Sequence, residues 1–103
     1  MDDPYAALRE HFAAVEGATV NTGRGAQGIK WGGKMFAMFY KGDLLLQLAP
    51  ERVAEMTGSG EGLAFDPGTG RPMADRVLIP ASHKDDWISL AEESRRYAAS
   101  RSR

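Results

Sequence analysis

The stretch that decides the fold is residues 34–48, Lys-Met-Phe-Ala-Met-Phe-Tyr-Lys-Gly-Asp-Leu-Leu-Leu-Gln-Leu. Two apolar runs, residues 35–40 and 44–48, flank a short polar segment at residues 41–43. Apolar runs of this length, separated by a short loop that contains a glycine, are typical of a β-hairpin. A single helix across both runs is the alternative, and Gly42 and the aromatic content argue against it.

Both faces of this predicted hairpin are apolar. Alternate residues of a strand point to opposite faces, so Phe36, Met38 and Tyr40 share one face of the first strand, and Leu45 lies on an apolar face of the second. A strand with one solvated face would alternate apolar with polar residues. Both faces therefore need cover, and the helices of a two-layer fold cover only one. We expect a second copy or another protein over these four residues; the alternatives are a ligand, a chain segment or a terminal helix that wraps around the sheet.

The sequence before the hairpin predicts one helix and short strands. Residues 4–16 predict a helix, because apolar side chains recur at spacings of 3, 4 and 3 after an Asp-Pro start. Residues 18–22 are rich in β-branched side chains and predict a strand. A glycine-rich loop then leads to a short or irregular strand at residues 28–31.

The sequence after the hairpin predicts two helices with strands between them. Pro50 is placed to open a short helix that Gly58 ends. Short apolar runs at residues 63–65 and 76–79 predict two strands. Residues 84–99 predict the last helix, with an apolar stripe that begins at a tryptophan and a capping pattern before it.

If the short or irregular segment at residues 28–31 is not counted, the predicted order is helix, three strands, helix, two strands, helix. Short connections favour antiparallel pairing, so we expect an α+β fold, a two-layer sandwich with the helices on one face of an antiparallel sheet. The chain has 103 residues, of which 43% are hydrophobic, as in an average soluble domain. We expect one domain over residues 1–103, with an ordered core at about residues 4–99.

Composition and charge exclude several classes of function. The chain has no cysteine, which excludes disulfides, thiolate metal sites and a cysteine nucleophile. Its formal net charge of −1 argues against nucleic acid as a partner, and the basic residues near the C-terminal end and in the glycine-rich loop are explained by solvation. No apolar run is long enough to span a bilayer, and the acidic start is unlike a secretory signal. We therefore expect no membrane association and a cytoplasmic protein.

Two glycine motifs match nucleotide-binding patterns in letters only. Residues 23–28 read G-x-G-x-x-G, but an apolar strand follows them instead of the helix whose N-terminus holds pyrophosphate. Residues 28–34 read G-x-x-x-x-G-K, but Met35 stands where the magnesium-binding Ser or Thr belongs. We expect no nucleotide and no other cofactor.

The residues available for catalysis form no recognisable set. His11 and His83 are the two histidines of the chain, and no serine, aspartate or second histidine lies at a telling spacing from either. Two histidines without cysteine make no convincing zinc site, and no pair of carboxylates is brought together by local spacing for acid–base work. The sequence therefore predicts no catalytic residues and no metal site, which points away from an enzyme.

A small-ligand or anion site is the alternative function. Two glycine-rich segments, residues 23–33 and 58–70, would bring Trp31, Gly32, Gly33, Lys34 and Arg71 together if they meet in space. Backbone N–H groups and two cations are suited to hold an anion. The simpler interpretation is that the glycines permit tight turns and that the two cations pair with carboxylates.

Several segments resemble the N-terminal domain of the TfoX (Sxy) family of regulators. Residues 32–38, Gly-Gly-Lys-Met-Phe-Ala-Met, are similar to the central signature of that family. Residues 44–48, 65–73 and 87–97 resemble, in order, its next strand, its G-R-P-M segment and its closing helix. The resemblance covers about residues 5–99, and the related YjbR-like (MmcQ-like) group shares part of it.

The resemblance implies a fold and little chemistry. It implies one layer of helices on a five-stranded antiparallel sheet, similar to secretion chaperones, and a regulatory or uncharacterised role with no catalytic residues to transfer. Combined with the two-faced hairpin, it predicts a small cytoplasmic, non-enzymatic binding or regulatory module that acts through protein contacts as a homodimer, with a further protein partner of unknown identity.

Overall fold

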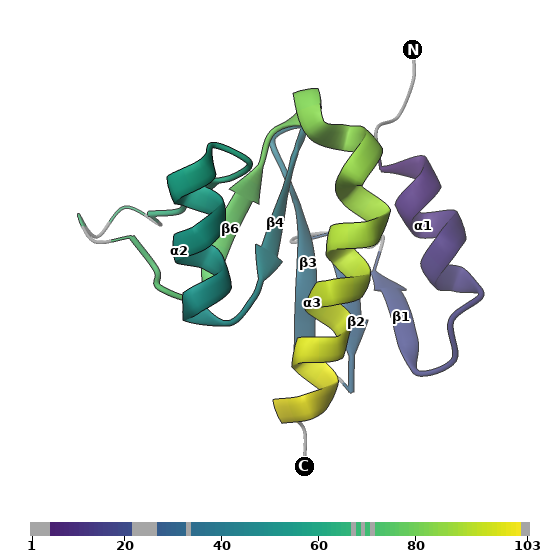
Figure 1. The fold of residues 1–103 in the computed structure, drawn as a ribbon. Helices are drawn as coiled ribbons and strands as arrows, with labels where there is room; N and C mark the ends of the chain where they lie inside the picture. Colours follow the sequence, from purple (N-terminus) through teal and green to yellow (C-terminus); the bar gives the residue numbers. More distant parts are fainter. Residues whose placement is uncertain are drawn as a thin grey trace.

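The computed structural model describes residues 5–21, 27–32, 34–66, 68, 70 and 72–101. Six strands in this part of the chain form one antiparallel sheet, in the order β1-β2-β3-β4-β6-β5 (Figure 1). The elements in chain order are α1 (Ala6–Ala13), β1 (Ala18–Asn21), β2 (Gly28–Trp31), β3 (Lys34–Tyr40), β4 (Asp43–Gln47), α2 (Pro50–Ser59), β5 (Leu63–Ala64), β6 (Arg76–Ile79), a 3₁₀ helix η1 (Ala81–Asp86) and α3 (Trp87–Arg101).

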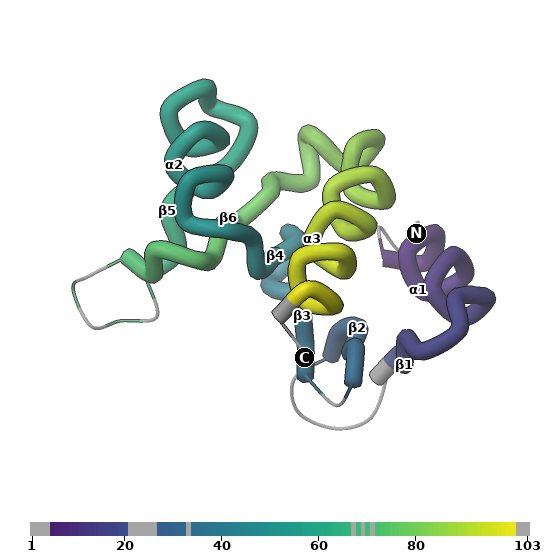
Figure 2. Tube along the Cα trace, turned by 60° about the horizontal axis from the view of Figure 1, so that its bottom comes forward, coloured from purple at the N-terminus to yellow at the C-terminus, as the bar shows by residue number. Residues whose placement is uncertain are grey.

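The three α-helices lie on one face of this sheet. α1 packs on β1, α3 on β2, β3 and β4, and α2 on β5 and β6. Figures 1 and 2 show all three on the same side of the strands, with α3 over the middle of the sheet. The α+β fold and the antiparallel sheet predicted from the sequence are therefore confirmed.

Two details of the predicted element order are wrong. The described residues contain six strands where the predicted order counted five, because residues 28–31 form a strand that pairs with both β1 and β3. The last α-helix begins at Trp87, after the 3₁₀ helix η1, and not at residue 84. No side chain at the start of η1 caps it; instead, the N–H of Ala81 donates to Asp43 Oδ1 at 2.9 Å.

The hairpin over residues 34–48 forms as predicted. β3 and β4 pair in register from Ala37–Leu46 to Tyr40–Asp43, and the loop between them is the two residues Lys41 and Gly42. Both loop residues have positive φ, 48° and 88°. Two-residue hairpin loops favour this conformation because it matches the twist of the strands, and glycine adopts it without strain.

A β-bulge interrupts the pairing of β3 with β2. Ile29 pairs with Ala37 and the next residue, Lys30, pairs with Met35, so Phe36 is an extra residue with no partner on β2. An extra residue in one strand turns two successive side chains towards the same face. Phe36 and Ala37 both belong to the helix-side core, with 1% and 0% of their surface exposed.

The hydroxyl of Ser94 stabilises the strands at this bulge. Ser94 lies on α3 and is completely buried. Its Oγ is 3.0 Å from the carbonyl oxygen of Phe36 and 2.5 Å from that of Gln47, one on β3 and one on β4. A hydroxyl has one proton to donate, so Ser94 supplies one hydrogen bond that these two carbonyls share and that links α3 to both strands of the hairpin.

The core lies between the helices and the inner face of the sheet. Its members share near-complete burial and come from the three α-helices, from strands β2, β3, β4 and β6, and from Leu48 after β4. They are Leu8, Phe12, Ile29, Phe36, Ala37, Leu44, Leu46, Leu48, Val53, Met56, Val77, Ile79, Trp87, Leu90 and Ala91. At one end of this core, Tyr5 stacks between Phe39, at 4.2 Å, and Trp87, at 5.5 Å.

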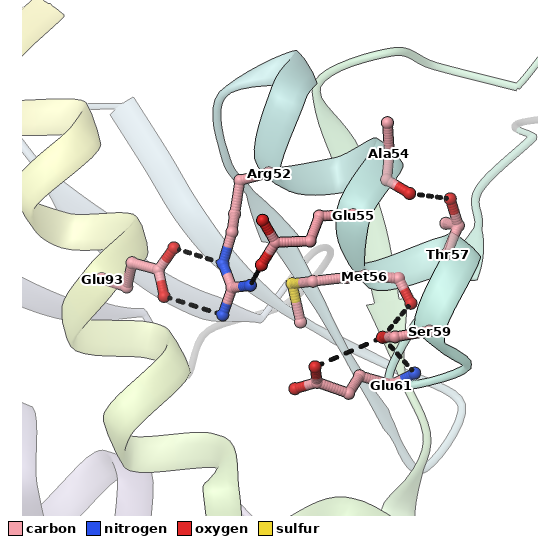
Figure 3. Close-up of polar contacts among 8 residues, drawn as sticks. All are labelled: Arg52, Ala54, Glu55, Met56, Thr57, Ser59, Glu61 and Glu93. Atoms are coloured by element: carbon pink, nitrogen blue, oxygen red, sulfur yellow. Dashed lines mark hydrogen bonds and ion pairs between the residues drawn. The ribbon is translucent and has the colours of Figure 1, made fainter.

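An ion pair joins α2 to α3. Arg52 Nε and Nη2 donate to the two oxygens of Glu93 at 2.8 and 3.4 Å, and Arg52 also contacts Glu55 on its own helix (Figure 3). The hydrogen bond to Glu93 raises the pKa of Arg52. All three side chains are partly exposed, so the pair contributes at most about 1 kcal/mol and mainly orients α2 beside α3.

Gly28 tests the bulge directly. A Cβ at Gly28 would lie 2.2 Å from the backbone oxygen of Ala37, because the two strands approach closely beside the bulge. We expect Gly28→Ala to lower the free energy of unfolding by about 2–3 kcal/mol. Gly58→Ala is the matched control, since a Cβ there meets nothing within 4 Å and Gly58 lies inside α2. We expect that control to stabilise the fold by up to about 1 kcal/mol.

Urea unfolding followed by circular dichroism measures both variants. Equal effects of the two substitutions would contradict the close approach of β2 and β3.

Candidate functional site

The sheet face turned away from the helices carries a continuous row of mostly apolar residues. Residues that pair directly across antiparallel strands point to the same face. The pairs Gly28–Met38, Met38–Leu45, Leu45–Leu78 and Leu78–Leu63 therefore form one row across β2, β3, β4, β6 and β5. We name this row of five residues the outer row, and the face that carries it the outer face.

The members of the outer row differ in exposure. Leu45, in the middle, is only 3% exposed although it is not part of the helix-side core. Met38 and Leu78 on either side of it are half-buried, and Leu63 at the β5 end is 52% exposed. Among the residues that the structure describes, no helix packs on this face.

Polar and aromatic residues flank the outer row on both sides. On one side lie Lys30, paired with Met35, and Gln47, paired with Arg76. On the other side Tyr40 pairs with Asp43. An apolar centre with a polar margin is the usual composition of a protein–protein interface.

The aromatic part of this margin is fixed by ring contacts. Tyr40 packs edge-to-face on Phe65, with ring centroids 5.4 Å apart. Phe65 directly follows β5 and lies level with Arg76, so this ring contact reaches across the outer row. The amine of Lys41 lies 5.3 Å from the centroid of the Tyr40 ring. On the opposite side of the row, Asp75 Oδ2 lies 3.1 Å from Arg76 Nη1 and accepts from Gln47 Nε2 at 3.2 Å.

One residue predicted for this face lies elsewhere. Strict alternation groups Phe36 with Met38, Tyr40 and Leu45, but the bulge turns Phe36 inwards, where its ring packs edge-to-face on Phe12 of α1 at 5.5 Å. That prediction is wrong for Phe36. The structure places the other three together on the outer face.

The residues predicted for an anion site are only partly described. Gly33 and Arg71 lie outside the described residues, so their distance from the others stays untested. Trp31 is half-buried against the helix-side core, with the guanidinium of Arg95 5.1 Å from its ring centroid. Gly32 occupies the turn after Trp31, and Lys34 is exposed at the start of β3. Trp31 therefore has a structural partner, and the anion site stays a prediction.

A histidine–carboxylate contact joins α1 to α3. His11 Nε2 lies 3.4 Å from Glu92 Oε2, and Arg95 Nε donates to both oxygens of Glu92 at 3.0 and 3.2 Å. Chiefly the hydrogen bond from Arg95, and to a smaller degree His11, lower the pKa of Glu92 below its ordinary value of 4.5. A carboxylate held in its charged form by arginine is a poor proton acceptor, so these residues connect elements and do not form an acid–base pair.

Neither a metal site nor a membrane span is present among the described residues as a second candidate. The described part of the chain contains no group of three or more His, Asp or Glu side chains placed to hold a metal ion. None of the described helices has the length and apolar content needed to cross a membrane.

Comparisons of the chain with known protein families, with curated proteins and with solved structures found no match. The resemblance to the TfoX N-terminal family therefore stays a prediction, and the outer face has to be interpreted from its own geometry.

The remaining residues of the outer face were not predicted from the sequence. Leu78 and Leu63 complete the row, and Phe65 and Arg76 complete its margin. The alternation in residues 76–79 was the available signal, because it separates Arg76 and Leu78 from Val77 and Ile79. This alternation assigns Arg76 and Leu78 to the outer face only once the register of β6 with β4 is known.

Glu92 provides a test of the contact between α1 and α3. A carboxylate whose pKa is lowered by folding stabilises the protein above its unfolded pKa, near 4.5, and loses that contribution as the pH falls through its folded pKa. We expect Glu92→Gln to lower the free energy of unfolding at pH 7 by about 1 kcal/mol, and we expect the difference from wild type to shrink steadily below pH 4.5.

Denaturant unfolding between pH 7 and pH 3 measures this difference. Glu10→Gln, at an exposed position of α1, controls for the loss of one negative charge. A difference that stays constant with pH would contradict the pairing of Glu92 with Arg95.

Proposed function

We propose that the chain is a small, non-enzymatic binding module that acts through protein contacts, and that the outer face is its docking surface. The observation that carries the proposal is the outer row, which runs across five strands with polar and aromatic residues on both sides. Burial of such a row removes apolar surface from water, at roughly 25 cal/mol per Å².

We propose a second copy of the chain as the occupant of this face. Two sheets that stack face to face bury their facing side chains in a layer about 10 Å thick. The margins of the outer row carry both signs of charge, with Lys30 and the ion pair of Arg76 with Asp75 on one side and Asp43 on the other. A face of this composition can complement itself, which a homodimer requires.

A regulatory role, a location in the cytoplasm and membership of the TfoX N-terminal group belong to the same proposal as expectations from the sequence. The anion site at Lys34 and Arg71 is the alternative. The contact of Trp31 with Arg95 favours a structural role for Trp31 over a role in binding an anion. The experiments below therefore test the dimer.

Met38→Lys tests the docking surface. Met38 lies in the outer row between Gly28 and Leu45 and is half-buried. A buried amine without a partner is costly, so we expect the variant to raise the dissociation constant of the dimer by about 100-fold or more. The matched control is Ala54→Lys, at an exposed position of α2 on the opposite side of the sheet.

Sedimentation velocity measures the association, and circular dichroism reports whether each variant is folded. Leu63→Asp, at a position that is already 52% exposed, serves if Met38→Lys unfolds the chain. A wild-type chain that stays monomeric at high micromolar concentration would overturn the proposal, as would a Leu63→Asp or folded Met38→Lys variant that dimerises like Ala54→Lys.

A further inference from the structure

We infer that the outer face is a site of reversible oxidation, and that conversion of the Met38 thioether to a sulfoxide prevents the second copy from docking. The inference rests on the docking surface proposed above and concerns its regulation. The oxidant is a peroxide: the sulfur gives an electron pair to one oxygen of hydrogen peroxide, the O–O bond breaks, and the other oxygen leaves as water. The chain has no cysteine, so its sulfur chemistry is confined to methionine.

The β-bulge places two thioethers on the same face of the sheet. Met35 and Met38 are three residues apart, and in a regular strand such residues point to opposite faces. The extra residue in β3 brings both to the outer face. Met38 pairs with Gly28 in the outer row, and the sulfur of Met35 lies 3.0 Å from the position that a Cβ on Gly28 would occupy. The missing side chain of Gly28 therefore leaves room for the Met35 sulfur beside the row.

The four described methionines differ in their access to an oxidant. Met35 and Met38 are half-buried on the sheet, whereas Met56 is fully buried in the helix-side core. Met73 is 37% exposed and lies before β6, outside the outer row. Because oxidation follows exposure, we expect peroxide to modify the outer face and Met73 while the packing around Met56 stays intact.

A sulfoxide on Met38 opposes docking. Its partners across the row are Gly28 and Leu45, and Leu45 is only 3% exposed. A sulfoxide is polar, and burial of a polar group among apolar neighbours without a hydrogen-bond donor is unfavourable. In the monomer this group stays in contact with water. Oxidation of Met38 therefore shifts the equilibrium from dimers towards monomers.

The second methionine of the outer face has a different neighbour. Met35 pairs with Lys30, whose amine is a hydrogen-bond donor suited to a sulfoxide oxygen. We therefore expect oxidation of Met35 to weaken docking less than oxidation of Met38 does. Both changes are reversible, because methionine sulfoxide reductases restore the thioether at the expense of a dithiol, which becomes a disulfide as the oxygen leaves as water.

Sedimentation of dilute samples treated with hydrogen peroxide tests the inference. The variants are Met38→Leu and Met35→Leu, and Met73→Leu is the matched control for an exposed methionine outside the row. Leucine has a similar volume and is well tolerated in place of methionine, and it is not a target of peroxide. Mass spectrometry of peptides shows which methionines carry an added oxygen, and circular dichroism shows that each sample is folded.

We expect oxidation to raise the dissociation constant of wild-type dimers at least about tenfold, and we expect the two sulfoxide reductases, one for each epimer, to restore it. Met38→Leu should dimerise like wild type and keep its dissociation constant within about twofold after oxidation. Met35→Leu and Met73→Leu should lose most of the affinity that wild type loses.

The same samples separate failure of the inference from failure of the proposed function. Wild-type dimers that carry a sulfoxide on Met38 and keep their dissociation constant would overturn the inference and leave the docking of two copies in place. An oxidised Met38→Leu variant that loses as much affinity as wild type would overturn it as well. Untreated wild type that stays monomeric at every concentration would overturn the docking surface, and its regulation with it.

Discussion

The arrangement of the sheet depends on the hydrogen bond that one buried serine makes at a bulge. Ser94 on α3 reaches the carbonyl oxygens of Phe36 and Gln47, at the point where β3 carries one residue more than β2 can pair. Ser94 itself is completely buried, and polar groups in a protein interior are almost always hydrogen-bonded. Through Ser94, the irregular part of the central hairpin is tied to the helix that covers it.

The bulge decides which side chains of β3 face the core. On one side of it Met38 points outwards, and Phe36 and Ala37 both turn towards the helices. Met35, on the other side, points outwards again, since its sulfur lies 3.0 Å from the position of a Cβ on Gly28. One extra residue therefore gives the core a large aromatic ring and still leaves two methionines on the outer face.

The sequence predicts the hairpin, the antiparallel α+β fold and three of the four residues grouped on the outer face. It fails at Phe36 because alternation assumes a regular ladder, and nothing within residues 34–40 marks an extra residue. The close approach of β2 to β3 at Gly28 lies beside the bulge. A glycine in a glycine-rich segment does not by itself indicate such an approach. Leu78 and Leu63 depend on long-range register, which residue patterns in one strand do not contain.

The two faces of the sheet have different roles. The helix side holds the large core, and its polar contacts, Arg52 with Glu93 and Arg95 with Glu92, connect structural elements. The outer face carries the apolar row with a margin of mixed charge, and it is the surface that we propose for a second copy. The function that we propose resides on the outer face of the sheet.

Oxidation of individual methionines at low and high protein concentration tests this account most directly. Met35 and Met38 lie on the outer face, and Met56 is fully buried in the helix-side core. Because a second copy covers the outer face at high concentration, we expect peroxide to oxidise Met35 and Met38 readily in dilute protein and several-fold more slowly in concentrated protein. We expect Met56 to react slowly at both concentrations. Rates at Met35 and Met38 that do not change with concentration, or a Met56 that reacts as fast as they do, would contradict it.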